Sequence, residues 1–107
     1  MTENWKTKTA FLVLLAVKDN PKHGYEIANY IREKSGGYFS VSFGNLYPVL
    51  HRLEKDGLLE SRLAEVGEEK TKKVYSLTKA GRKELANEKN QFQAFIGAYG
   101  KMMGSET

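Results

Sequence analysis

The sequence contains no cysteine, only two prolines and two histidines, and a single tryptophan among its 107 residues. The absence of cysteine excludes thiol catalysis, disulfide bonds and cysteine-ligated zinc. The two histidines stand apart, and with the scattered carboxylates they do not have the spacing of a structural metal site. The sequence also has no acid–nucleophile pattern and no glycine-rich phosphate-binding loop. We therefore expect a protein that is not an enzyme and needs no metal or cofactor.

A long hydrophobic run is also lacking, because the longest one, residues 10–17, is far too short to span a bilayer. Lys6 and Lys8 precede this run, as in a signal peptide, but the polar segment 18–21 that follows it indicates a helix end rather than a cleavage site. The content of 40% hydrophobic and 28% charged residues is typical of a single small globular domain. The sequence thus predicts a cytoplasmic protein without a membrane partner, and its formal charge of +4 favours a polyanionic partner.

The chain is organised around the stretch 42–59. An apolar stripe recurs there at helical spacing and consists of Leu46, Val49, Leu50 and Leu53. Ser42 or Asn45 is suited to cap the start of this helix, and Gly57 is suited to the left-handed conformation that ends one. The sequence therefore predicts a short helix with one face packed inward.

The opposite face of this predicted helix carries hydrogen-bond donors and positive charge, with no carboxylate near its centre. Its residues are Gly44, Tyr47, Pro48, His51, Arg52 and Lys55. A helix with a packed inner face and a donor-rich outer face fits a DNA major groove. From this stretch alone, an ordinary amphipathic helix whose polar side is merely hydrated is equally consistent.

Two further helices are predicted before this one. The first, at 4–18, is apolar nearly all round, which favours cover by the domain core on one side and by a second subunit on the other. The second, at 23–34, ends at the glycines of 35–37, where the chain can reverse. Two short helices joined by a glycine-containing turn, the second with a basic outer face, are typical of a helix-turn-helix.

The segments 58–66 and 72–78 alternate apolar and polar residues and predict a β-hairpin with a charged tip at 67–71. A hairpin directly after a helix-turn-helix is a wing, and its lysines suit backbone phosphates. These lysines are Lys70, Lys72 and Lys73. Glu68 and Glu69 would repel phosphates, so a hydrated turn with self-paired charges fits the hairpin at least equally well.

A last helix is predicted from 79 to about 103, with an apolar seam formed by Leu85, Phe92, Ile96 and Tyr99. We expect that no other surface of the same chain covers this seam. An exposed apolar seam of this kind indicates a homodimer. A helix folded back on its own domain is the alternative. The residues expected in the dimer interface are Phe11, Leu12, Leu85, Phe92, Phe95, Ile96 and Tyr99.

Together these elements predict an α+β fold that is mainly α. Residues 1–78 would form a winged helix-turn-helix DNA-binding domain whose first helix also contributes to the dimer. Residues 79–107 would form a C-terminal dimerisation helix and a tail.

Three groups of residues also carry a resemblance to a known family. They are His23-Gly24-Tyr25 with Ile27; Gly44-Asn45-Leu46-Tyr47-Pro48-Val49-Leu50 with Arg52-Leu53-Glu54 and Gly57-Leu58-Leu59; and Lys73-Val74-Tyr75 with Leu77-Thr78 and Gly81. In this order and spacing they resemble the PadR-like winged-helix transcriptional regulators, over roughly residues 8–85. The single C-terminal helix is similar to that of the family's shorter subgroup.

The resemblance implies a dimeric repressor that places one recognition helix per subunit in successive major grooves of operator DNA. The residues expected to contact DNA, including Ser42 and His51 beside the matching positions, are Tyr25, Ser42, Asn45, Tyr47, Pro48, His51, Arg52, Lys55, Lys70, Lys72 and Lys73. The resemblance also implies a small planar or phenolic effector at the dimer interface, which releases the operator and contacts Trp5, Phe92 and Ile96. The alternative function is a winged-helix protein-interaction module that binds nucleic acid only nonspecifically.

Overall fold

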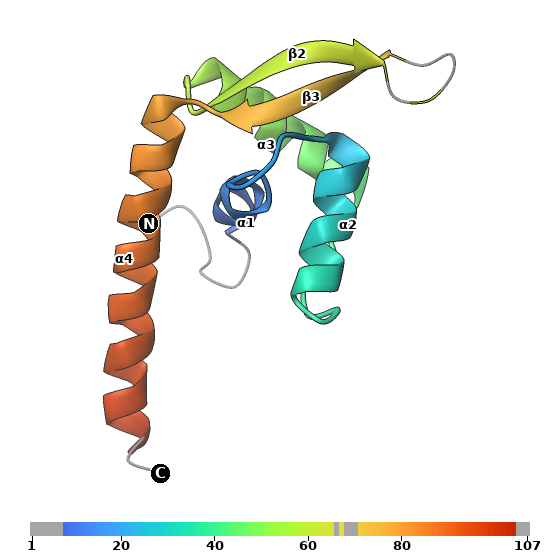
Figure 1. Cartoon of the computed structure of the whole chain (residues 1–107). Helices are drawn as coiled ribbons and strands as arrows, with labels where there is room; N and C mark the ends of the chain where they lie inside the picture. Colours follow the sequence, from blue (N-terminus) through green and yellow to red (C-terminus); the bar gives the residue numbers. More distant parts are fainter. Residues whose placement is uncertain (1–7, 66, 68–70, 105–107) are drawn as a thin grey trace.

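The computed structural model describes residues 8–65, 67 and 71–104, and its elements follow the order of a winged helix-turn-helix (Figure 1). They are α1 (Thr9–Ala16), β1 (Lys22–His23), α2 (Gly24–Lys34), α3 (Phe43–Lys55), β2 (Leu59–Glu65), β3 (Thr71–Leu77) and α4 (Lys79–Met103). The strands form one antiparallel sheet in the order β1-β3-β2. The predicted fold class, mainly helical with a wing and a long C-terminal helix, is therefore confirmed.

The ends of α2 follow from local side-chain chemistry. The His23 ring accepts a hydrogen bond from the backbone N–H of Glu26, and the Glu26 carboxylate accepts one from the N–H of His23 in return. After the helix, Gly36 and Gly37 adopt positive φ angles of 65° and 83°, as predicted for the reversal. The strand β1 is not predicted from the sequence, because its two residues are too few to show an alternating pattern.

Both ends of α3 are capped as predicted. The Ser42 hydroxyl accepts a hydrogen bond from the N–H of Asn45 at 3.2 Å, so Ser42 rather than Asn45 is the N-cap. At the other end Gly57 has φ 80°, and the N–H of Leu58 donates to the Leu53 carbonyl at 2.9 Å. From this turn the chain continues directly into β2, the first strand of the hairpin that forms the wing.

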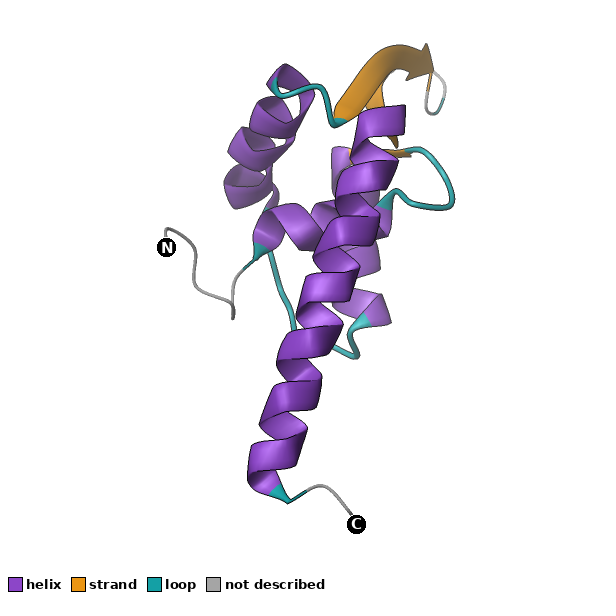
Figure 2. Cartoon of the chain, turned by 90° about the vertical axis from the view of Figure 1, so that its left-hand side faces the viewer, coloured by secondary structure: helices purple, strands orange, loops and turns teal. Residues whose placement is uncertain are grey.

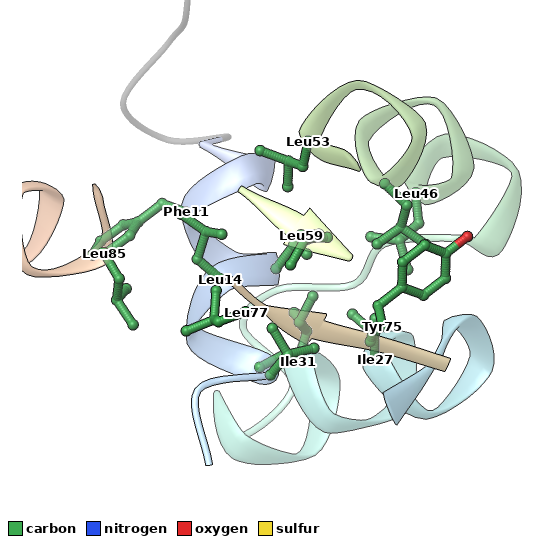
Figure 3. Close-up of a cluster of buried hydrophobic side chains, with 14 residues drawn as sticks. Phe11, Leu14, Ile27, Ile31, Leu46, Leu53, Leu59, Tyr75, Leu77 and Leu85 are labelled. Atoms are coloured by element: carbon green, nitrogen blue, oxygen red, sulfur yellow. The ribbon is translucent and has the colours of Figure 1, made fainter. Parts of the chain in front are cut away.

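The core gathers the inward faces of all four helices and the wing (Figure 3). Leu46 and Leu50 of α3 are fully buried and Leu53 is 6% exposed, whereas Val49 is half-buried against the same core, so the predicted stripe is confirmed with Val49 at its edge. Tyr75 lies at the edge of the cluster, with its hydroxyl oxygen pointing away from the other labelled side chains (Figure 3). The buried residues are Phe11, Val13, Leu14, Ala16, Val17, Ile27, Ile31, Leu46, Leu50, Leu53, Leu59, Tyr75, Leu77 and Leu85.

The helix α4 crosses α1, which Figure 1 shows nearly end-on, and then continues past the rest of the fold (Figures 1 and 2). The Phe92 ring meets Phe11 edge-on at 5.8 Å between centroids, and the Lys8 ammonium pairs with the Glu88 carboxylate at 2.8 Å. Leu85 is buried in the core of the same chain. The prediction that no surface of this chain covers the apolar seam of α4 is therefore wrong for the first half of the seam. That half packs against α1 and covers the second apolar side of α1.

The second half of α4 is different. Ile96 and Tyr99 are each about half exposed, and Met102 and Met103 are largely exposed. This extension gives the chain its long dimension, in overall extents of 55 × 28 × 25 Å. In the part of the chain that the structure describes, no helix is long and apolar enough to cross a membrane.

We predict that Gly81→Ala lowers the free energy of unfolding by about 1–3 kcal/mol, because a Cβ at this position would collide with the Leu58 backbone carbonyl. That carbonyl also accepts the N–H of Thr78 at 3.1 Å and cannot move freely. The matched control is Gly97→Ala in the same helix, where a Cβ meets nothing within 4 Å. Urea unfolding should show the control unchanged or more stable by up to about 1 kcal/mol. Equal stability of the two variants would contradict the close approach at Gly81.

Candidate nucleic-acid interface

The outer face of α3 is an exposed polar surface, as predicted. All the residues expected on this face are exposed: Gly44, Tyr47, Pro48, His51, Arg52 and Lys55. Asn45 and Ser42, also expected to contact DNA, are exposed too, Ser42 just before the helix. Pro48 has no N–H, so it cannot donate the bond that the Gly44 carbonyl would receive in a regular helix. The Arg52 side chain is 82% exposed, with its Nε 3.9 Å from the Asp56 carboxylate. The α3 surface thus offers both donors and acceptors to an outside partner.

A row of aromatic rings links this helix to α2. The Tyr25 ring stacks on Phe43, with centroids 4.6 Å apart and planes at 18°. Phe43 is followed by Tyr47 at 6.2 Å and Tyr47 by His51 at 6.4 Å. Phe43 is missing from the residues predicted for this site, although its spacing of four from Tyr47 places both on one helical face.

Gly24 allows the ring row to form. A Cβ at Gly24 would collide with the Phe43 ring, so only glycine lets this ring lie against the first turn of α2. The ring in turn supports Tyr25, which is 53% exposed, and Tyr47, which is 48% exposed. The two tyrosines are therefore presented to solvent on rigid elements rather than on loops.

The wing closes one side of this surface. The Lys72 ammonium lies over the Tyr25 ring, 4.9 Å from its centroid. A hollow of about 200 Å³ separates β3 from α2 and α3. Its lining residues include Tyr25, Tyr47, Lys72, Lys73 and Tyr75. Lys70, also predicted to contact phosphates, lies outside the described residues.

Lys73 has an acidic partner that the sequence does not predict. Its ammonium lies 3.3 Å from Oε1 of Glu54, on the last turns of α3. Oε2 of the same carboxylate accepts a hydrogen bond from the Ser61 hydroxyl at 2.5 Å. The Ser61 hydroxyl, and then Lys73, lower the pKa of the Glu54 carboxyl below its ordinary value of 4.5, against an opposing effect of burial. Glu54 is therefore ionised at neutral pH.

A separate apolar groove of about 310 Å³ lies between α1, α4 and the connector after α2. Phe92 and Ile96, two of the residues expected to hold an effector, line it, whereas Trp5 lies outside the described residues. Its walls are Lys8, Phe11, Leu12, Leu15, Phe39, Lys89, Phe92, Gln93 and Ile96.

The residues expected in a dimer interface fall into two groups. Phe11 and Leu85 are buried within the chain, and Leu12, Phe92 and Phe95 are half-buried. Ile96 and Tyr99 leave the largest areas free for another molecule.

Known proteins resemble this chain in both sequence and structure. The sequence model of the "Transcriptional regulator PadR-like family" matches residues 13–87. The transcriptional regulator Rv3488 of Mycobacterium tuberculosis is 37% identical over 87% of this chain and 83% of its own length. The negative transcriptional regulator PadR of Bacillus subtilis is 31% identical over 70% of this chain, and the match covers 41% of PadR, so the chain spans about two fifths of that relative.

Solved structures agree with these matches. B. subtilis PadR in complex with operator DNA superposes with a TM-score of 0.67 and 29% identity, over 73% of this chain and 44% of that one. A PadR family transcription regulator from Clostridium difficile R20291 superposes with a TM-score of 0.75 and 26% identity, over 89% of this chain and 96% of that one. The family match extends over most of the described fold, from α1 into α4. The chain therefore belongs to the PadR-like family of transcriptional regulators.

Proposed function

We propose that this regulator binds operator DNA as a homodimer and represses transcription, and that a small planar or phenolic effector releases it. The observation that carries the proposal is the exposed outer face of α3, with the ring row and the half-buried wing lysine Lys72 beside it. B. subtilis PadR, which shares this fold, was solved in complex with operator DNA. The formal charge of +4 suits the same partner.

In this proposal α3 enters the major groove. Asn45 and Arg52 supply the donors and acceptors that read base edges, because amide and guanidinium groups pair in two-point fashion with adenine and guanine. Tyr25, Tyr47 and Lys72 surround the hollow beside the helix, where a backbone phosphate fits. Ser42, Pro48, His51 and Lys55 complete the proposed contact surface.

The second half of α4 is the proposed dimer contact. This part of the helix extends beyond the domain that covers the first half (Figure 2). Its exposed apolar side chains are Ile96, Tyr99, Met102 and Met103. An exposed apolar surface of this kind marks an association site. A second copy of the chain would set the two recognition helices about one turn of DNA apart, roughly 34 Å.

The apolar groove is the proposed effector site. Its volume of about 310 Å³ lies at the lower end of the range for small-molecule sites. Phe92 and Ile96 line it and lie close to the exposed part of α4, so a bound ligand would contact the helix that sets the dimer geometry. A ligand that prefers a different separation of the recognition helices would lower DNA affinity by linkage.

Selection of bound fragments from random DNA tests the proposal directly. We expect an enriched sequence with two related half-sites, and loss of binding when the matching planar aromatic compound is added. A steep fall of affinity with salt and no sequence preference would instead support a protein-interaction module with nonspecific nucleic-acid binding.

We predict that Tyr47→Ala and Arg52→Ala each weaken operator binding roughly tenfold, because both side chains belong to the proposed contact surface. Fluorescence anisotropy with labelled operator measures the effect. The matched control is Tyr38→Ala, which removes an 80% exposed tyrosine from the connector after α2. If Tyr47→Ala binds the operator as tightly as the Tyr38→Ala control, Tyr47 does not contact DNA.

We predict that Ile96→Asp raises the dimer dissociation constant at least about tenfold, because a carboxylate would be buried without a partner. Sedimentation measures the change. Ile96 is 53% exposed in the single chain, so the domain itself should stay folded. Ala94→Asp, exposed about half a helical turn away from Ile96 on the opposite side of α4, is the control. A dimer unaffected by Ile96→Asp would place the interface elsewhere.

A further inference from the structure

One carboxylate joins the recognition helix to both strands of the wing. Glu54 accepts a hydrogen bond from Ser61 of β2 through Oε2 and pairs with Lys73 of β3 through Oε1. The Glu54 and Lys73 side chains are 30% and 45% exposed, so solvent screens this bridge only in part. Three elements are thus connected at a single point.

The strand register explains why both partners reach Glu54. Ser61 lies opposite Tyr75, and Lys73 lies opposite Leu63, so all four side chains lie on the same face of the hairpin. That face is the one whose Tyr75 enters the core beside α3. Lys72 leaves β3 on the other face, and its ammonium reaches the Tyr25 ring. The two neighbouring lysines therefore line the same hollow but have different partners.

We propose that Glu54 is a positioning residue, and that Lys73 holds the wing against the recognition helix instead of contacting a DNA phosphate. The proposal rests on the DNA-binding function proposed above. The bridge fixes the distance between two surfaces that reach the duplex together, α3 and the hairpin. Its loss lowers the preference for operator over other DNA, because helix and wing no longer fit one site at once. The number of phosphates that the protein neutralises stays the same.

The experiment compares affinities for operator and random DNA over a range of salt concentrations. We expect Glu54→Gln and Lys73→Met each to reduce the ratio of the two affinities by up to about fivefold. We expect the double variant to be no worse than either single variant, since both remove one interaction. The salt slope of Lys73→Met should equal that of the unaltered protein, whereas Lys72→Met, the neighbouring control, should lower the slope by about one.

A charge swap separates the two roles of Lys73. Glu54→Lys combined with Lys73→Glu restores an ion pair between α3 and β3, and we expect it to recover the operator preference lost in the single variants. If Lys73 contacts a phosphate, the swap places a carboxylate against DNA and binding worsens further. That result, or a Lys73→Met slope lowered by about one, would overturn the proposal.

Hydrogen exchange without DNA keeps this test independent of the proposed function. We expect the backbone amides of β2 and β3 to exchange faster in Glu54→Gln and in Lys73→Met, and to return to the original rate in the charge swap. Unchanged exchange in both single variants would show that the bridge does not hold the wing. A protein that shows this exchange pattern but has no DNA preference would contradict the proposed function alone.

Discussion

Leu46, Leu50 and Leu53 of α3 are removed from water on one side of the helix, and the rest of the site depends on this burial. Each buried leucine contributes about 1.5–3 kcal/mol relative to an exposed one, which prevents the helix from rotating about its axis. Because the stripe faces inward, Tyr47, His51 and Arg52 must face outward. The chemistry offered to an outside partner is therefore a consequence of packing on the opposite face.

The helix α1 connects this surface to the groove. It is apolar nearly all round because the core covers one side and α4 covers the other, with Phe92 against Phe11. The groove walls include Phe39 of the connector that leads into α3, as well as Phe92 and Ile96 of α4. A ligand there would touch both the segment before α3 and the helix proposed to join two copies. Ligand binding and dimer association would then involve the same few side chains.

The two adjacent lysines of β3, Lys72 and Lys73, have different partners. Lys72 lies over the Tyr25 ring, while Lys73 is neutralised in part by Glu54. The two adjacent residues line the same hollow but have different partners, because their side chains leave the strand on opposite faces. The same alternation brings Ser61 to Glu54, where its hydroxyl holds the pKa of the carboxyl below the ordinary value and keeps it ionised.

Local patterns along the chain are enough to predict the helices, the wing and the outer face of α3, because helical spacing, Ser42 and Gly57 act over a few residues. They do not indicate β1, the stacking of Phe43 between Tyr25 and Tyr47, or the pairing of Lys73 with Glu54. Nor do they show that α4 covers α1 before extending beyond the domain. Each of these features joins residues whose distance depends on how the elements pack, so local spacing could not predict it.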